Sequence, residues 1–466
     1  MRSVLYFFFC LPLLLSAQRD AGYQTPPAAI ADLVNAPLTP AVSLNGPGDW
    51  MLLLERPGFP PIEELAQPEL RIAGLRINPR TNGGSRANTV TGLQLKQISN
   101  NQLFTVTGLP PQPLIEDTSW SPDGRHIAFT HTVANGLELW VLDVSTQTAR
   151  KLTDARVNDV TSGLPYTWMP DNRHLLAQLT PAGRSAAPVE PPAPTGPVIQ
   201  ATTGKKAPAR TYQDLLKNPF DEALFEYYAT AQLTKIELQT GAQQSIGVPS
   251  IYTTVSPSPN GAYVLVATIQ RPFSYLVPYY NFPTRYQLID PNGDLVQTLA
   301  DIPLAENIPK GFNAVRTGPR SFTWRADKPA TLFWVEAQDE GDPAVKTEVR
   351  DQLFYLEAPF KGPKQESITF RLRYGGVTWG NDNLAIAYEW WWSTRQEITS
   401  SFAPGDKDSK KTLFDRSSED RYGDPGSFVT ADNAAGRSVL LTNAAGDELF
   451  LTGQGASPRS EERRVG

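Results

Sequence analysis

Short runs in which apolar and polar residues alternate recur along most of the chain, and each is bounded by a polar turn. The clearest starts at Trp120, where the turn Ser-Pro-Asp-Gly precedes apolar residues 127–129, and a second alternating run follows over residues 137–144. Pro, Asp, Asn and Gly favour tight turns because they preset φ or tolerate the left-handed region. Period-two alternation is typical of strands. The pattern therefore predicts a cassette of two strands joined by a tight turn.

This cassette recurs at intervals that suit one structural unit each. Well-formed copies begin at Trp120, Trp168, Pro257, Trp324 and Trp379, a weaker copy spans Val429–Leu441, and a faint copy spans Val42–Leu54. A four-stranded propeller blade needs roughly 40–50 residues, and most intervals fit one blade with insertions. The strand pattern excludes solenoids of helix pairs. We therefore expect an all-β fold, a β-propeller of about seven blades with the last one incomplete.

The longest interval contains an insertion over residues 180–228. Residues Thr180–Arg210 are rich in Pro and Ala and lack apolar periodicity, so we interpret them as a linker. After the linker, Thr211 and Asp214 have the spacing of an N-terminal helix cap with an acidic first turn. A second short helix is expected over Asp221–Tyr228. The insertion thus adds a short helical element outside the blades.

The first 17 residues have the composition of a secretory signal peptide. A short basic start, Met1-Arg2, precedes an apolar run over residues 4–15, and cleavage is expected after Ala17. The run is too short to span a bilayer, although a transmembrane anchor is the alternative interpretation. The one cysteine, Cys10, lies in this run. We expect a periplasmic or secreted protein without disulfides and without a stable membrane span.

Composition adds two constraints. The 466 residues include 42 Pro and 34 Gly, as expected for a chain with many turns, and 40% hydrophobic residues, enough for a sizeable core. The formal net charge of −6 does not indicate a basic surface of the kind that binds nucleic acid. Nucleic acid is therefore not an expected partner.

Catalytic signatures are missing from the sequence. A serine hydrolase of the α/β type would carry Gly-x-Ser-x-Gly, and this string does not occur. The three histidines are His126, His131 and His174. Because His126 and His174 occupy the same cassette position, we interpret them as part of the repeat, and His131 has no triad partner in the sequence. We predict no catalytic residue in this chain.

Metal and cofactor sites are not expected either. Residues 290–294 (Asp-Pro-Asn-Gly-Asp) resemble the opening of a calcium loop, but Leu295 stands where the loop needs glycine and no Glu closes it. A hairpin turn is the favoured interpretation. Zinc is disfavoured because neither cysteines nor paired histidines are available.

Two aromatic segments leave a structural and a functional interpretation open. Residues 271–280 are too rich in proline for a central strand, so they either line a rim or cavity or pack under a neighbouring blade. Trp390, Trp391 and Trp392 follow an apolar strand, and alternate rings along a strand must face opposite sides. At least one ring should lie on a blade face, and another could form a contact surface.

Several long, non-repetitive stretches resemble one family. They are residues 57–66, 71–77, 211–233, 271–280 and 414–420, and the resemblance extends over about residues 24–458. These stretches are similar to the N-terminal region of glutamyl endopeptidases, serine peptidases of the prolyl oligopeptidase group. The resemblance implies a propeller followed by an α/β-hydrolase domain with a Ser-Asp-His triad that cleaves after Glu. It also implies that the propeller restricts access to the active site, favouring peptides and unfolded polypeptides.

The chain departs from that family at its C-terminus. It ends before the α/β-hydrolase domain, so no triad residue can be assigned to any position. We interpret residues 459–466 as a sequencing-adapter artefact, because the start of a common adapter translates to Arg-Ser-Glu-Glu-Arg-Arg, the residues at 459–464. A natural charged tail is the alternative. The expected propeller domain then spans residues 18–458, with the C-terminal hydrolase domain absent.

Two function classes follow from the sequence. The first is the substrate-gating part of an exported serine endopeptidase, not catalytic as given, whose partners are a peptide substrate and the missing hydrolase domain. The second is a stand-alone periplasmic propeller that binds a peptide, a glycan or an envelope partner. Hydrolysis of lactones or glycosides on the propeller itself would need metal ligands or paired carboxylates at the channel, and the sequence does not single out such a set.

Overall fold

The computed structural model describes residues 26–161, 163–193, 196, 211–453 and 455. The predicted signal peptide (1–17) and the segment interpreted as an adapter artefact (459–466) lie outside the described residues, as does much of the predicted linker. None of the helices in the described ranges is long and apolar enough to cross a membrane.

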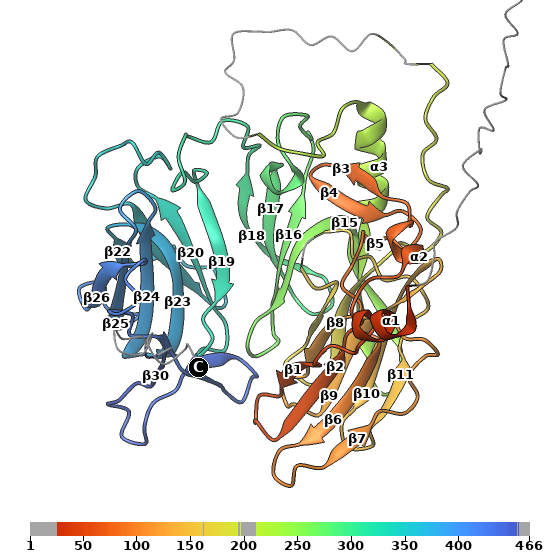
Figure 1. Cartoon of the computed structure of the whole chain (residues 1–466). Coiled ribbons are helices and arrows are strands. Elements are labelled where there is room, and N and C mark those ends of the chain that lie inside the picture. Colours follow the sequence, from red (N-terminus) through yellow and green to blue (C-terminus); the bar gives the residue numbers. More distant parts are fainter. Residues whose placement is uncertain (1–25, 162, 194–195, 197–210, 454, 456–466) are drawn as a thin grey trace, which may run out of the picture.

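Antiparallel four-stranded sheets stand side by side around a central space, with their first strands facing the middle (Figure 1). Blade 1 consists of β1 (Ala41–Leu44), β2 (Trp50–Glu55), β6 (Gly92–Gln97) and β7 (Leu103–Thr105). Blade 2 consists of β8 (Ile115–Trp120), β9 (His126–Val133), β10 (Gly136–Asp143) and β11 (Thr148–Lys151).

Blades 3 and 4 share one long strand. Blade 3 contains β12 (Tyr166–Trp168), β13 (His174–Leu179), β14 (Ala231–Glu237) and the first half of β15 (Gln243–Pro257). Residues 243–250 of β15 pair with β14, and residues 251–257 pair with β16. Blade 4 contains that second half with β16 (Val264–Ile269), β17 (Thr284–Ile289) and β18 (Leu295–Ile302). The two blades therefore form one continuous seven-stranded sheet.

The remaining strands complete two blades and begin a seventh unit. Blade 5 contains β19 (Pro319–Trp324), β20 (Thr331–Ala337), β21 (Asp351–Glu357) and β22 (Gln365–Phe370). Blade 6 contains β23 (Arg373–Asn381), β24 (Leu384–Trp391), β25 (Gln396–Phe402) and β26 (Lys411–Ser417). The seventh unit has the short pairs β28 (Thr430–Asp432) with β29 (Ser438–Leu440) and β27 (Ser427–Phe428) with β30 (Leu451–Thr452). The predicted fold, an all-β propeller with an incomplete last blade, is confirmed.

Each of the seven predicted cassette turns joins the first and second strands of one unit, and we call these connections the first turns. In blade 2, Asp123 organises the first turn: its Oδ1 accepts hydrogen bonds from the Ser121 hydroxyl (2.6 Å) and the Arg125 amide (3.1 Å). Gly124 adopts φ +69°, which a residue without Cβ reaches at no cost. The residue types from which we predicted this turn therefore stabilise it through local side-chain hydrogen bonds.

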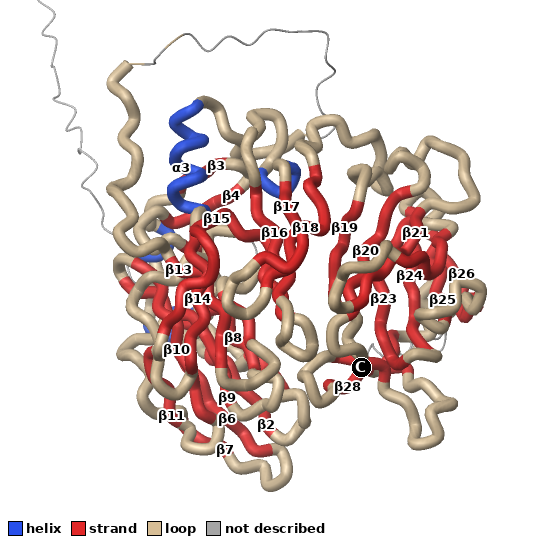
Figure 2. Tube along the Cα trace, turned by 180° about the vertical axis from the view of Figure 1, so that it is seen from behind, coloured by secondary structure: helices blue, strands red, loops and turns tan. Residues whose placement is uncertain are grey.

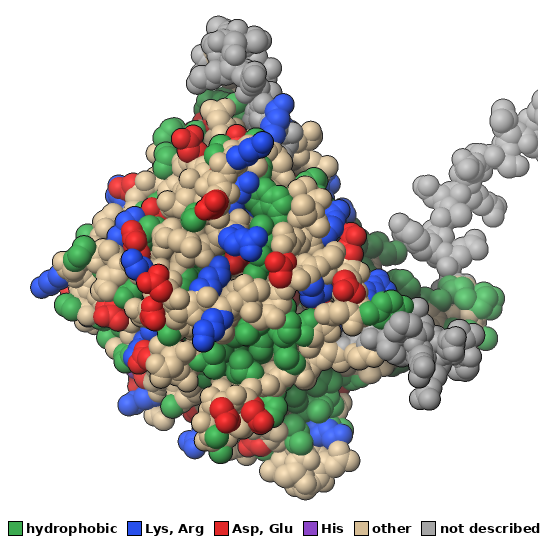
Figure 3. Space-filling model, turned by 90° about the vertical axis from the view of Figure 1, so that its left-hand side faces the viewer, with side chains coloured by type: hydrophobic (Ala, Val, Ile, Leu, Met, Phe, Trp, Pro, Cys, Tyr) green, Lys and Arg blue, Asp and Glu red, His purple; other side chains and the backbone are tan. Residues whose placement is uncertain are grey.

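Apolar clusters fill the spaces between successive blades. Leu95 and Phe129 are fully buried between blades 1 and 2. Between blades 5 and 6, the rings of Phe333 and Trp379 lie 4.5 Å apart. A fully buried side chain of this size contributes roughly 1.5–3 kcal/mol relative to exposure. Packing between blades thus provides the core. On the side of the molecule seen in Figure 3, charges of both signs are dispersed and apolar side chains gather in the lower half.

Most of the parts outside the blades form a cover at one end of the ring. The helices are α1 (Ala28–Val34), α2 (Ile62–Leu65), α3 (Pro219–Ala229) and the 3-10 turn η1 (Tyr279–Asn281), and a small sheet consists of β3 (Leu70–Ile72), β4 (Leu75–Asn78) and β5 (Gly83–Gly84). Figures 1 and 2 show α3 beside β3 and β4 at this end. Fifteen buried residues, Phe225 and Phe282 among them, form the core below α3. We call α2 with β3–β5 the cap.

The predicted cap at Thr211 and Asp214 is wrong. Residues 211–218 form an irregular, bent segment rather than a helix, and Asp214 has φ +58°, outside the helical region. Its carboxylate binds the Arg76 guanidinium at 2.7 Å, and its carbonyl accepts the Gly74 amide at 2.8 Å. The second predicted helix is confirmed as α3, where Asn218 caps the Asp221 amide and Pro219 occupies the first position.

Candidate functional site

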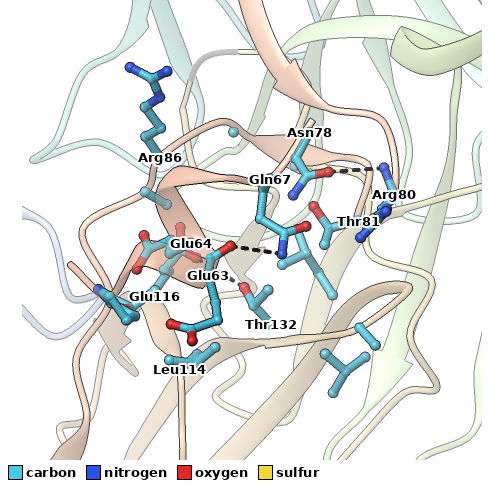
Figure 4. Close-up of a pocket in the computed structure, with 18 residues that line it drawn as sticks. Glu63, Glu64, Gln67, Asn78, Arg80, Thr81, Arg86, Leu114, Glu116 and Thr132 are labelled. Carbon is cyan, nitrogen blue, oxygen red and sulfur yellow. Dashed lines mark hydrogen bonds between the residues drawn. The ribbon is translucent and has the colours of Figure 1, made fainter. Parts of the chain in front are cut away.

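A cleft of about 300 Å³ separates the cap from blade 2 (Figure 4). The cap contributes Glu63 and Glu64 from α2, and blade 2 contributes Glu116 and Leu137. At the base of the cleft, a Cβ on Gly83 would lie 2.7 Å from a methyl group of Leu137. Glycine at position 83 therefore lets the cap lie close to this leucine of blade 2, and a larger residue would require the Leu137 side chain to shift.

Glu116 is the most perturbed carboxyl in this cleft. Burial is the main cause that raises its pKa to about 7. A hydrogen bond from the Thr132 hydroxyl (3.0 Å) acts to lower this pKa, whereas the nearby charges of Asp117 and Glu64 raise it. Burial also raises the pKa of Glu64. A carboxyl with a pKa near 7 can accept or release a proton at neutral pH.

Two more carboxyls lie close enough to Glu116 to interact with its charge. Asp117 follows Glu116 in β8, has φ +51°, and accepts the Thr130 hydroxyl at 2.9 Å. Asp159 lies in the connection between β11 and β12 and accepts a hydrogen bond from the Gly84 backbone. Burial raises the pKa of both, and repulsion from Asp117 and Glu116 adds to the effect on Asp159. We call Glu64, Glu116, Asp117 and Asp159 the acidic wall.

The cleft offers a mixed surface for hydrogen bonding. Carboxylates and apolar side chains line the same cleft as Arg80 and Arg86, so the surface offers acceptors, donors and apolar contact to a polypeptide. None of the residue groups in the described part of the chain has the arrangement of a metal site. Sequence reasoning missed these residues, although adjacent acidic residues inside an otherwise regular strand were a visible signal.

The three histidines lie in separate places. His126 and His174 are the first residues of β9 and β13, which are equivalent positions, as the repeat predicted. The His174 ring is 2.6 Å from Asp171 Oδ2, and the buried His131 ring contacts the Leu114 backbone at 3.2 Å. Burial lowers the pKa of His131. Within the described ranges, none of the hydrogen bonds joins a histidine ring to a serine hydroxyl. The absence of a catalytic residue stays a prediction.

The segment that resembled a calcium loop forms a hairpin turn between β17 and β18. Asp290 Oδ1 accepts the amides of Asn292 and Asp294, each at 2.9 Å, and Gly293 has φ +99°. The carboxylate is therefore engaged with its own turn, as the hairpin interpretation predicted.

The first aromatic segment, residues 271–280, packs mainly against α3 and the cap. Phe273 is 8% exposed, and its ring lies 5.1 Å from Phe225 and 5.3 Å from Phe282. Arg271 forms ion pairs with Glu222 (2.6 Å) and Glu226 (2.9 Å) of α3. These contacts favour the structural interpretation for this segment.

The second aromatic segment includes an exposed ring. Trp392 is 41% exposed and lies beside the 68% exposed Phe312, with the two rings tilted and their centroids 4.5 Å apart. The Arg395 guanidinium lies over the Trp392 ring at 3.9 Å. Trp391 instead faces Arg350 at 4.5 Å. Exposed aromatic pairs of this kind occur on contact surfaces, so the functional interpretation stays open here.

Six four-stranded blades, with a seventh unit begun, define this chain as a β-propeller. No protein-family model matches it. Two curated relatives, both named "Probable glutamyl endopeptidase, chloroplastic", are similar to it along nearly its whole length. The relative from Oryza sativa subsp. japonica is 39% identical over 457 residues, and the one from Arabidopsis thaliana is 40% identical over 458. The resemblance to glutamyl endopeptidase is therefore confirmed.

The alignments cover 94% of this chain but 48% and 47% of the two relatives. The chain thus spans about half the length of the curated relatives it matches. The solved structures that match are less similar to this chain, and their sequence identity to it is low. A prolyl endopeptidase structure matches with a TM-score of 0.44 at 10% identity, covering 90% of this chain and 49% of that one. Acylaminoacyl peptidase from Pyrococcus horikoshii matches with a TM-score of 0.38 at 10% identity, covering 82% and 46%. With such scores these likenesses add nothing to the assignment.

Proposed function

We propose that this chain is the substrate-gating propeller of an exported serine endopeptidase that resembles glutamyl endopeptidase. The observation that carries the proposal is the 39–40% identity maintained over 94% of the chain. The catalytic triad would reside in an α/β-hydrolase domain outside this sequence, and the substrate would be a peptide or an unfolded polypeptide. Export to the periplasm or the medium rests on the predicted signal peptide alone.

The acidic wall and its cleft support a polypeptide substrate. A peptide backbone presents N–H donors at regular intervals, and Glu63, Glu64 and Glu116 offer acceptors along one cleft. Arg80 and Arg86 in the same cleft offer donors to peptide carbonyls. A propeller that binds extended chains in this way would admit peptides and unfolded segments more readily than folded proteins.

The test begins with the gene. We would sequence the source locus with long reads across the codons for Ser457 and Pro458. A reading frame that continues into a Gly-x-Ser-x-Gly domain agrees with the proposal, and the full-length enzyme can then be compared with a variant that lacks residues 41–452. The gating role predicts that this deletion increases hydrolysis of a folded protein relative to a short Glu-containing peptide. An unchanged ratio would exclude gating by the propeller.

A stand-alone binding propeller is the second candidate, and the exposed pair Phe312–Trp392 favours it. A genuine stop codon after Gly466 would remove the peptidase interpretation. Binding would then be measured by calorimetry with peptides and oligosaccharides, with Trp392→Ala as the site variant and Tyr422→Ala, which removes another exposed ring, as its control. Equal binding by both variants would exclude this surface.

A further inference from the structure

The first turns of the propeller form a ring at the end of the molecule opposite the cap. Neighbouring turns are joined directly: the Asp123 amide donates to Asn172 Oδ1 (3.0 Å), and the Asn260 amide donates to the Pro329 carbonyl (3.0 Å). Between blades 5 and 6, Arg325 binds Asp382 at 2.8 Å. These contacts fix the rim of the channel at this end.

The first turn of the seventh unit does not stay in this ring. Residues 433–437 form the tip of the β28–β29 hairpin, and Figure 1 shows the hairpin directed toward the middle of the ring. Figure 2 shows β28 below the centre from the opposite side. We call residues 433–437 the hairpin tip.

Contacts of the hairpin tip reach blades on several sides of the channel. Asn433 Nδ2 donates to the Ala326 carbonyl of blade 5 at 2.9 Å, and Arg437 donates to the Pro257 carbonyl of blade 4 at 2.5 Å. A Cβ on Gly436 would lie 2.3 Å from Pro122 Cβ of blade 2.

The same hairpin also approaches the first and third blades. Ala434 and Ala435 line a surface hollow together with Pro170 of blade 3 and Pro259 of blade 4. The Asp432 carboxylate lies 2.5 Å from where a Cβ on Gly46 of blade 1 would be. One hairpin can meet blades 1 to 5 together only from the centre of the ring.

We propose that the hairpin tip is a plug that closes the channel at the end formed by the first turns. A polypeptide would then enter the channel only from the opposite end, where the cap and the acidic wall lie. This inference concerns the route into the channel and does not depend on peptidase activity.

Shape holds the plug in its seat more than charge does. Loss of hydration lowers the pKa of Arg437, and within the described ranges no carboxylate lies at ion-pair distance from this guanidinium. The cost of this desolvation offsets part of the stability that the hydrogen bond to the Pro257 carbonyl contributes. The glycine at 436 has φ +65° and faces Pro122 so closely that no larger residue fits. The tip is therefore seated by shape rather than by strong ionic contacts.

Two glycines in the same region allow a matched test. Gly436 and Gly446 both have positive φ (+65° and +74°), and each donates its amide to an asparagine carbonyl three residues earlier. A Cβ at 446 would meet nothing within 4 Å, whereas a Cβ at 436 would collide with Pro122. Gly436→Ala and Gly446→Ala therefore carry similar backbone strain, but only the first displaces the tip.

Spin labels would report the position of the tip in the full chain. With Cys10→Ser as background, labels at the exposed sites Ala434→Cys and Thr146→Cys measure the distance from the tip to the turn between β10 and β11. We expect one narrow distance in this parent and in the Gly446→Ala variant, and loss of the narrow peak in Gly436→Ala. A broad distribution in the parent, or the same narrow peak in both glycine variants, would overturn the proposal.

Hydrogen exchange provides a second measurement that needs no substitution. If the plug is seated, the Gly436 amide is shielded by the surrounding blades, and the equivalent Gly446 amide is not. We expect Gly436 to exchange more slowly by about tenfold or more. Equal exchange at the two turns would show that the tip is not seated, even if Gly436→Ala failed to fold.

Discussion

The Arg373 guanidinium binds Asp339 Oδ2 at 2.8 Å and Asp351 Oδ1 at 2.9 Å, and the three side chains are at most 3% exposed. Arg373 opens β23 of blade 6, whereas both aspartates belong to blade 5, so this ion network joins two blades. Burial opposes ionisation of Asp339, but hydrogen bonds from Arg373 and Arg350 outweigh it and lower its pKa. The Asp339 carboxylate is therefore ionised at neutral pH.

Removing the cation should be costly because each buried aspartate then loses one of its two arginine partners: Asp339 keeps Arg350 and Asp351 keeps Arg320. We expect Arg373→Met to reduce the free energy of unfolding by about 2–4 kcal/mol at pH 7, as urea denaturation would measure. Since Asp339 has a lowered pKa in the folded protein, its stabilisation is present above its unfolded pKa and is lost as pH falls. The difference between Arg373→Met and the parent should accordingly shrink on acidification.

The exposed pair Arg285–Asp301 provides the control. Its side chains are 44% and 59% exposed, and its nitrogen–oxygen distance of 2.6 Å is at least as short as the distances from Arg373 to its two aspartates. Arg285→Met should cost less than about 1 kcal/mol because water screens the pair. Similar costs for both substitutions would contradict the role assigned to burial.

Asn172 shapes the first turn of blade 3 and links it to the first turn of blade 2. It adopts φ +58°, which asparagine tolerates, and its Oδ1 accepts the Asp123 amide at 3.0 Å. Asn172→Ala should cost about 2 kcal/mol, since it loses the hydrogen bond and strains the backbone. Asn172→Gly keeps the backbone freedom and should cost about 1 kcal/mol less. Thermal unfolding of the two variants would test this order, and a larger loss for the glycine variant would refute it.

Phe273 and Trp392 represent the two aromatic segments, and their truncation should reduce the stability of the protein by different amounts. Phe273→Ala removes a buried ring that packs on Phe225 and Phe282, and we expect a loss of about 3–5 kcal/mol in unfolding free energy. Trp392→Ala removes an exposed ring and should cost about 1 kcal/mol or less. Denaturant unfolding would show the contrast. If Trp392→Ala unfolded the protein, this ring would be structural rather than a contact surface.

The blades could be predicted from the sequence because their signals are local. Asp123 and Asn260 bind amides within their own turns, so the residue types alone indicated where strands reverse. The cap was not predicted from the sequence because its strands are only two to four residues long, and they are stabilised by contacts with α3 and blade 2 rather than by local signals. The helix expected at Thr211 failed for a related reason: the Asp214 carboxylate binds Arg76, which is 138 residues away.

The acidic wall lay beyond sequence reasoning for the same physical reason. Glu116 and Asp117 are neighbours in the chain, but Glu64 and Asp159 reach them only through the folded cap and the connection between β11 and β12. Their raised pKa values depend on burial that no local pattern reports. The hairpin tip is similar, because its sequence is that of an ordinary turn and only its position in the ring is unusual.

The raised pKa of Glu116 predicts that this residue destabilises the fold at neutral and alkaline pH. Its pKa is about 7 in the folded protein against an ordinary value of 4.5, so the folded state binds more protons between these values. Stability therefore falls as pH rises from about 4.5 to about 7 and stays low above that. Each pKa unit corresponds to about 1.4 kcal/mol, which sets an upper bound of about 3 kcal/mol for this residue.

Glu116→Gln should accordingly be as stable as the parent near pH 4 and more stable by about 1–3 kcal/mol at pH 8. The amide keeps the shape of the side chain and can still accept the Thr132 hydroxyl. It also removes a charge that raises the pKa of Asp159, so repulsion within the acidic wall falls. Urea unfolding across pH 4–8 measures the difference, and Glu366→Gln, which removes an exposed carboxylate from β22, controls for net charge. Parallel pH profiles for Glu116→Gln and the parent would mean that Glu116 is hydrated and that the acidic wall does not share protons near pH 7.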